Sequence, residues 1–338
     1  IFAAVMAWKF IEEPEFTPST APVDRIGLSL LAVGMGSLQY VLEEGNRDDW
    51  FNSNLILGLA CVALVCLVVF VVHQLETEHP IVDLRVFKDS SYSAATGINF
   101  LVGMALFSAG FLFSLYCGTV MHYKAFDIGL LFLKGCWIQV LLMPFIGKFA
   151  GRIDGRYMIT IGMATLVVSL WMHTQFSAMA DMGALIAPLF VRSVGLTFIF
   201  VPLSIMALSG LPAQQRGNGA GLFNLTRELG GSIGTAWMSS LLSRSQIRAQ
   251  SYYSEHVNVF SSETTARLSN IQNTNGWRFF DPTTSAYAMV KNTIASQAMV
   301  KAFNNCFWWI TILFTFGMLF IIFLKKPKSD GVAIHDAH

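Results

Sequence analysis

Long apolar segments alternate with short polar connections along most of this sequence. Eight of them approach the roughly 20 residues that an α-helix needs to cross the hydrocarbon core of a bilayer. A further apolar stretch, residues 1–8, reads as the end of a truncated span, and a proline-rich connector follows it. The pattern predicts an all-α polytopic membrane protein with eight full transmembrane helices and one truncated helix. The full spans are expected at residues 26–41, 54–72, 93–116, 128–146, 157–176, 182–208, 217–242 and 303–324.

A short basic segment between two of these spans sets the expected orientation. Residues 147–156 read GKFAGRIDGR and contain three basic side chains. Cytoplasmic loops of membrane proteins carry an excess of Lys and Arg, so we expect this loop inside the cell. The short connections on the opposite side then hold only Arg47 and Lys124 as basic residues, which is consistent with that orientation.

The same orientation places the long polar stretch 243–302 outside. At this length it exceeds an ordinary connection between helices. One interpretation is a partly ordered extracytoplasmic loop, and the other is a docking surface for an extracytoplasmic partner. From about Ser285 the sequence reads as a helix that runs into the last span.

Composition supports the membrane class and indicates little else. Apolar residues make up 54% and charged residues 13% of the chain, whereas soluble domains carry about a quarter charged residues. The net charge of +1 gives no reason to expect a nucleic-acid partner. The five cysteines form no CxxC pair and read as small packing residues. The sequence lacks HExxH and phosphate-binding loop motifs, so we predict no enzyme activity, no cofactor and no metal site.

Paired glycines lie on the span at residues 217–242. Gly217 and Gly221 are four residues apart, as are Gly230 and Gly234. Small residues at this spacing form a face on which membrane helices approach closely. We therefore expect these glycines to be helix-packing positions.

Several motifs, taken in order, resemble the fourteen-helix drug:proton antiporters of the major facilitator superfamily, and within them the EmrB-type multidrug exporters. The most specific motif is NLTR followed by GGSIG, at residues 224–227 and 230–234. Another, PIVDLRVFK at residues 80–88, resembles the cytoplasmic entry to the ninth helix of that family. Weaker matches lie at residues 36–39, 49–51 and 208–212.

The resemblance implies a division of the chain. Residues 1–24 would be the end of a truncated helix and a cytoplasmic connector, and residues 25–92 two extra helices that link the two halves. Residues 93–325 would form the C-terminal half of a major facilitator fold, with six helices, three-helix inverted repeats and the long periplasmic loop at 243–302. Residues 326–338 would be a cytoplasmic tail. The first six helices, apart from the truncated one, would be absent.

The basic loop resembles the second copy of the superfamily motif G-x-x-x-D-R-x-G-R. Gly147, Arg152, Gly155 and Arg156 match it, whereas the acidic position is a glycine and Asp154 is a displaced acidic candidate. In one interpretation the arginines bond helix-end carbonyls or a carboxylate and lock one conformational state. In the other the loop only anchors the orientation.

Four polar residues within the spans are candidates for the substrate and proton pathway: Arg192, Asn224, Arg227 and Glu228. Ionisable groups in a membrane usually face a protein interior or a water-filled cavity. Asn224 lies one turn before Arg227 and Glu228 and can share a polar face with them. Glu228 is either a proton site or an ion-pair partner, and the sequence favours the ion pair. Arg192 is a candidate for that partner, for cavity polarity, or for bonding to neighbouring carbonyls.

The resemblance implies proton-coupled efflux of amphipathic, drug-like compounds across a bacterial inner membrane by alternating access. The implied partners are a small-molecule substrate, protons and the lipid bilayer, with a periplasmic adaptor and an outer-membrane channel as further candidates. Two alternatives remain open. One is a major facilitator exporter of a metabolite or siderophore, and the other is a membrane scaffold or sensor that does not transport.

Overall fold

All regular structure in the described part of the chain is helical. The computed structural model describes residues 6, 24–77, 80–150, 153–212, 215–256, 266, 269–270 and 282–323. This confirms the all-α fold class. The long helices are α2 (Arg25–Glu44), α3 (Asn54–Glu76), α4 (Ser90–Thr119), α5 (Ala125–Ala150), α6 (Gly155–His173), α7 (Met182–Ser209), α8 (Arg216–His256) and α10 (Pro282–Gly317), with short 3-10 segments η1 (Trp50–Asn52), η2 (Leu84–Lys88) and η5 (Met318–Phe323).

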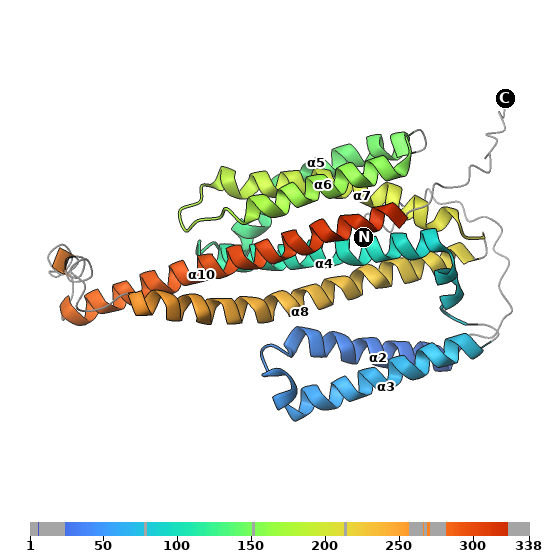
Figure 1. The fold of residues 1–338 in the computed structure, drawn as a ribbon, viewed down its shortest axis with the longest axis horizontal. Helices are drawn as coiled ribbons and strands as arrows, with labels where there is room; N and C mark the ends of the chain where they lie inside the picture. Colours follow the sequence, from blue (N-terminus) through green and yellow to red (C-terminus); the bar gives the residue numbers. More distant parts are fainter. Residues whose placement is uncertain are drawn as a thin grey trace.

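The helices form a bundle with one helix pair attached to its side (Figure 1). In the bundle, α4 packs along α8, α6 along α7, and α5 against α7, while α10 contacts α8, α6 and α4. The pair α2 and α3 lies beside α8, and its contacts with the bundle helices run through α2 and α8. The largest buried side chains are aromatic and come mainly from α4 and α10, so these two helices supply much of the core: Tyr92, Phe113, Tyr116, Phe303, Phe307 and Phe314.

Seven described helices are long and apolar enough to cross a membrane: α2, α3, α4, α5, α6, α7 and α10. The eighth span expected from the sequence, residues 217–242, is helical as α8 but does not reach this apolarity. It carries Arg227 and Glu228 and many small polar residues. Since α4, α10 and α2 contact α8, less of its surface remains for lipid, and it needs fewer apolar side chains.

The basic loop is shorter than the sequence predicts. Helix α5 continues to Ala150, so Gly147 and Lys148 are helical, and α6 begins at Gly155. A helix can leave the membrane without ending because its backbone hydrogen bonds are internal, and one glycine costs it only about 1 kcal/mol. Arg152 lies outside the described residues.

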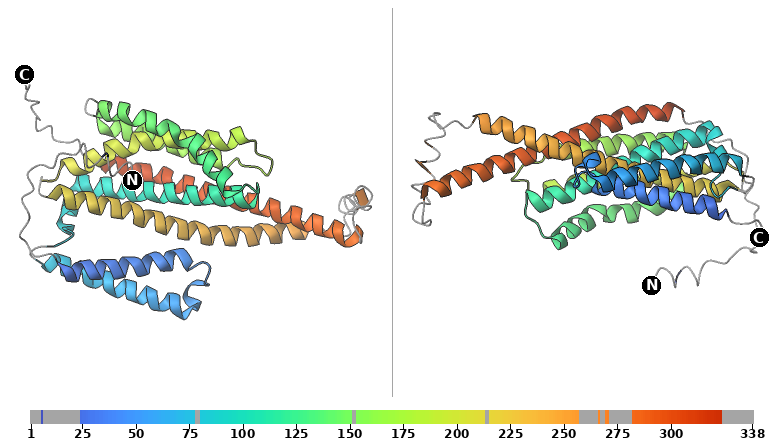
Figure 2. Two further views of the ribbon diagram at one scale, coloured as in Figure 1. Left: turned by 180° about the vertical axis from the view of Figure 1, so that it is seen from behind. Right: turned by 90° about the horizontal axis from the view of Figure 1, so that it is seen from below.

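Helices α8 and α10 extend well past their expected spans. Residues 243–256 continue α8, and the helix expected from about Ser285 begins at Pro282, so both flanks of the expected outer loop are helical. The two helices project together beyond the rest of the bundle (Figures 1 and 2). Most of the intervening segment, residues 1–5 and 7–23 of the truncated span and its connector, and the tail at 326–338 lie outside the described residues.

Candidate functional site

Helix α8 approaches α4 with almost no side chain between the two backbones. A Cβ atom added at Gly230 would overlap the carbonyl oxygen of Phe100, and one at Gly234 would lie 2.5 Å from the Ser108 Oγ atom. Gly103 of α4 is equally close to the backbone of α8, at Arg227. These three glycines therefore hold the two helices at a distance that no larger residue permits.

Two buried side chains of α4 add hydrogen bonds to this close packing. The Tyr92 hydroxyl donates to the Gly219 carbonyl oxygen at 2.8 Å. The Asn99 amide Nδ2 donates to the Phe223 carbonyl oxygen at 2.6 Å. Because both acceptors are backbone atoms of α8, these bonds fix its position along α4 without depending on the α8 side chains.

The two other glycines singled out from the sequence do not pack in this way. Gly217 and Gly221 have no atom within 4 Å of an added Cβ, and both are exposed. The four-residue spacing is the same in both pairs, but the two pairs lie on different faces of α8. Within the described structure Gly217 and Gly221 are therefore not packing positions.

Arg227 is half-buried and lies across an aromatic ring of α7. Its guanidinium carbon is 5.5 Å from the centroid of the Phe200 ring. A cation over a ring face is attracted by the ring quadrupole, with a gain of about 0.5–2 kcal/mol. Within the bundle, the Arg227 guanidinium is therefore stabilised by its contact with Phe200.

Glu228 and Asn224 lie one turn apart on α8, and both side chains are exposed. Across the described residues the ion pairs join Arg47 to Glu44 and His73 to Asp24. The expected ion pair between Glu228 and a neighbouring arginine is therefore wrong. Adjacent residues on a helix differ in direction by about 100°, which turns Glu228 away while Arg227 faces α7.

Arg192 is buried in the bundle, with 4% of its surface exposed. Its guanidinium carbon lies 5.6 Å from the centroid of the Phe132 ring of α5. The Nε and Nη1 atoms have no hydrogen-bond partner. Arg192 is thus directed into the contact between α7 and α5. It neither faces an open surface nor pairs with Glu228.

At the opposite end of the bundle, Asp154 and Gly155 form the start of α6. The Asp154 carboxylate accepts a hydrogen bond from the backbone nitrogen of Arg156 at 3.2 Å, so it caps the helix. The Arg156 Nε atom is buried and has no partner. Asp154 therefore does not pair with the Arg156 guanidinium. An added Cβ at Gly155 would lie 2.8 Å from the Met206 sulfur, so α6 meets α7 closely here.

The sequence of this chain is similar to those of known proteins. The family model of the Major Facilitator Superfamily matches residues 1–235. The chain belongs to the Major Facilitator Superfamily. This confirms the resemblance read from its motifs.

Similar proteins include some that are named for multidrug export or for resistance to fatty acids. The multidrug export protein EmrB of Haemophilus influenzae is 31% identical over 324 residues, which cover 96% of this chain and 62% of EmrB. The fatty acid resistance protein FarB of Neisseria gonorrhoeae is 32% identical, over 99% of this chain and 65% of FarB. EmrB of Escherichia coli K12 is 30% identical, over 94% of this chain and 61% of that protein. The chain thus spans about three-fifths of the length of these relatives and, like other members of its superfamily, is a multi-pass membrane protein.

One buried polar side chain was missed by the sequence reasoning. His173, at the end of α6, has no exposed surface, and its ring lies among those of Phe113, Phe176 and Phe307. Its Nδ1 atom lies 2.7 Å from the Ser169 carbonyl oxygen, and its Nε2 atom has no partner. The apolar residues that bury it are contributed by α4, α10 and the segment after α6, which no local pattern reveals.

Proposed function

We propose that this chain acts in proton-coupled export of amphipathic, drug-like compounds across a bacterial inner membrane. In this proposal residues 25–92 are the linking helix pair and residues 93–325 the C-terminal half of a fourteen-helix transporter. Substrate would move as the two halves rock about a site between them. The names of the relatives, which include multidrug export and fatty acid resistance proteins, support export of amphipathic molecules.

The observation that carries this proposal is the unpaired carboxylate of Glu228. It is exposed, has no ion-pair partner in the described structure and lies one turn from the Asn224 amide on a helix of the bundle. A carboxylate at such depth is costly unless it faces water or another protein surface. Glu228 can bind one proton and release it, which changes its charge from −1 to 0 and back. Arg227 stays charged throughout, held against Phe200.

The packing of α8 suits a half that rocks as one body. Gly230 and Gly234 hold α8 close to α4, and the hydrogen bonds of Tyr92 and Asn99 to the α8 backbone fix its position. Arg192 would act as a positioning charge inside the half, because its guanidinium is enclosed between α7 and α5.

The basic segment at 147–156 would lie on the cytoplasmic side in this proposal, with α8 and α10 projecting into the periplasm. The projecting helices offer a surface for a periplasmic adaptor that leads to an outer-membrane channel (Figure 2). Gly155 and the cap formed by Asp154 would let the end of α6 move against Met206 of α7. Arg156 and Arg152 would then bond different groups in the two states.

The test is transport by the full-length protein in proteoliposomes with an imposed pH gradient. A fluorescent amphipathic dye should move against its concentration only while the gradient lasts. Glu228→Gln should abolish gradient-driven movement and leave passive exchange of substrate. The matched control is Glu43→Gln, which removes an exposed carboxylate of α2 that the proposal does not use.

Other outcomes separate the alternatives. Gradient-driven movement that survives Glu228→Gln would remove this residue from the proton pathway. Export of a metabolite or siderophore without any dye movement would show that the substrate belongs to that class and is not an amphipathic, drug-like compound. A protein that moves no substrate at all, and whose Arg227→Ala and Glu228→Gln forms lose only a bound partner, would instead be a scaffold or sensor.

A further inference from the structure

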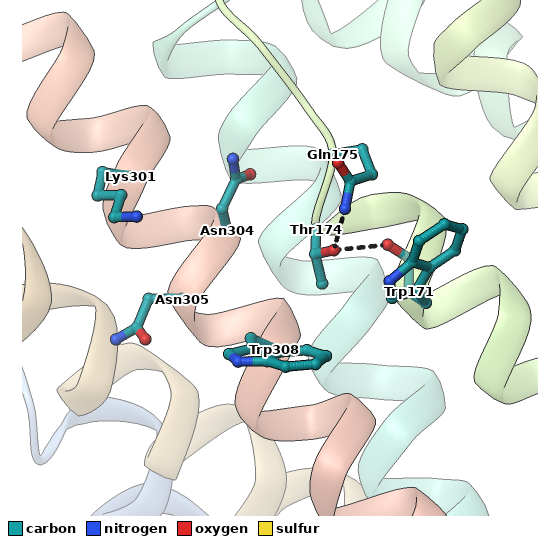
Figure 3. A pocket seen from close by; sticks show the side chains of 7 residues that line it. All are labelled: Trp171, Thr174, Gln175, Lys301, Asn304, Asn305 and Trp308. Carbon is teal, nitrogen blue, oxygen red and sulfur yellow. Dashed lines mark hydrogen bonds between the residues drawn. The ribbon is translucent and has the colours of Figure 1, made fainter.

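A cup-shaped pocket of about 240 Å³ lies between the end of α6 and helix α10 (Figure 3). It lies at the level where α10 leaves the bundle and begins to project. Two tryptophans, Lys301 and several uncharged polar side chains line it. None of these residues belongs to the contacts of α8, α4 and α7 described above.

One side of the cup is aromatic. Trp171 of α6 and Trp308 of α10 face it, and each indole is about half exposed, at 51% and 50%. Tryptophan is enriched where a membrane protein passes from hydrocarbon to headgroups, because an indole combines a large apolar ring with one N–H donor. Val168, one turn before Trp171, is also exposed. The helices therefore present apolar surface on the membrane side of the cup.

The other side of the cup is polar, and its hydrogen bonds leave one group free for a ligand. The Asn304 amide Nδ2 donates to the Phe176 carbonyl oxygen at 2.9 Å, which fixes the orientation of the amide. The Oδ1 atom of Asn304 then remains buried without a partner. Gln175 uses one amide hydrogen on the Thr174 hydroxyl, at 3.1 Å, and keeps the other. The free Gln175 amide hydrogen thus gives the cup a donor for a ligand.

Lys301 gives the cup a positive charge that has no ion-pair partner among the described residues. It is exposed and absent from the ion pairs of the described structure, which join Arg47 to Glu44 and His73 to Asp24. A second pocket of about 370 Å³ lies on its other side, between α10 and α8, and is lined by Arg248 as well as Lys301. Two cations from different helices therefore flank this part of α10.

We propose that the cup binds the headgroup of an anionic phospholipid of the surrounding bilayer. The Lys301 ammonium bonds the phosphate of a lipid such as phosphatidylglycerol, and the free amide hydrogen of Gln175 is donated to the same phosphate. The two indoles lie beside the ester region, and the acyl chains follow the exposed apolar surface of α6. With residues 147–156 on the cytoplasmic side, this lipid belongs to the outer leaflet. The site is independent of the proton pathway.

The bilayer is the occupant that the geometry favours. The cup opens beside helices whose composition fits a membrane span, and its aromatic side lies next to their apolar surface. A soluble anion would bind Lys301 but would make no apolar contact with the two tryptophans. A neutral amphiphile would contact the tryptophans and leave the Lys301 charge without a partner.

Quenching of tryptophan fluorescence by brominated lipids tests the proposal. The full-length protein is reconstituted in phosphatidylcholine vesicles that contain brominated phosphatidylglycerol or brominated phosphatidylcholine. Phosphatidylglycerol should quench more strongly, and Lys301→Ala should lower its apparent affinity roughly fivefold, which corresponds to about 1 kcal/mol for one basic side chain at an anionic surface. Replacing both tryptophans, with Trp171→Phe and Trp308→Phe, should remove the difference in quenching between brominated phosphatidylglycerol and brominated phosphatidylcholine.

Lys291→Ala is the matched control, because Lys291 is an exposed cation of the same helix that lines neither pocket. Lys291→Ala should leave the preference for phosphatidylglycerol unchanged, and Lys301→Arg should retain this preference. An equal loss in the Lys291 and Lys301 variants would overturn the proposal in favour of diffuse surface charge. A site that prefers a brominated fatty acid over phosphatidylglycerol, with Lys301-dependent quenching, would also overturn it, since the ligand would then be a free carboxylate.

Discussion

The Asn99 amide Nδ2 lies 2.6 Å from the carbonyl oxygen of Phe223, inside a contact where α4 and α8 meet almost backbone to backbone. The acceptor belongs to the helix that carries Asn224, Arg227 and Glu228. The position of these three polar side chains therefore depends on α4, although α4 contributes no charged residue to them. The candidate site is set by helix packing more than by direct contacts among its polar residues.

Asn99→Ala should lower the free energy of unfolding by about 1–3 kcal/mol, because it removes a fully buried hydrogen bond. Thermal unfolding of the purified protein in detergent measures the change. Ser114→Ala is the control, since Ser114 lies on the same helix and bonds only the Gly110 carbonyl oxygen of its own helix. Equal losses in both variants would contradict a special role of Asn99 in holding α8.

The glycines of α8 give a sharper comparison within one helix. Gly230→Ala should destabilise the protein by about 1–3 kcal/mol or more, because the methyl group would overlap the Phe100 carbonyl oxygen and force the helices apart. Gly221→Ala should be neutral or stabilise by up to about 1 kcal/mol, because its Cβ meets no atom and alanine favours the helix. The melting temperatures of the two variants measure this difference. Similar shifts in both would refute the conclusion that Gly230 faces α4 and Gly221 does not.

These glycines also show what the sequence could reveal. Apolar runs predict the spans because each helix must satisfy its backbone inside the bilayer, and length and composition record that need directly. The spacing of Gly217 and Gly221 is the same as that of Gly230 and Gly234, yet only the second pair faces α4. Which side of a helix meets its neighbour depends on the rotation of the whole helix, and a four-residue spacing carries no information about it.

The same limit explains the charged residues. The sequence favoured an ion pair for Glu228, with Arg192 as a candidate partner. The fold instead leaves Glu228 exposed and directs Arg227 to Phe200. A cation over an aromatic ring leaves no local signature, because the ring comes from another helix. The buried state of His173 is hidden for the same reason, since its neighbours come from α4 and α10.

The contact of Arg227 with Phe200 predicts a measurable loss on removal of the ring. Phe200→Leu should destabilise the protein by about 0.5–2 kcal/mol beyond the loss from Phe190→Leu, a phenylalanine of the same helix that contacts no arginine in the described structure. The excess should vanish when Arg227→Gln is also present. A double-mutant cycle from thermal unfolding measures this coupling, and additive losses would show that the ring contributes packing alone.

Asp24 lies directly before helix α2. Its contacts predict that the stability of the protein depends on pH. The backbone N–H of Gly27, followed by the His73 side chain, holds the pKa of the Asp24 carboxyl below its ordinary value of 3.8. A lowered pKa in the folded state means that the stabilisation is complete above the unfolded pKa and is lost as pH falls through the folded pKa. Melting temperature should therefore fall less steeply below about pH 4 in Asp24→Asn than in the unsubstituted protein. Identical acid profiles would contradict this contribution.

Substitution of Arg192 should change the stability of the protein and its export activity in opposite directions. Its Nε and Nη1 atoms are buried and have no hydrogen-bond partner, so the charge is enclosed at a cost in free energy. Arg192→Met fills the same space with an apolar side chain and should raise the free energy of unfolding by about 1 kcal/mol or more. If the charge serves transport, the same variant should lose gradient-driven dye export while folding better. Arg192→Lys should keep part of the export and gain no stability. A stabilised Arg192→Met protein with full export would show that the enclosed charge has no part in the proton pathway.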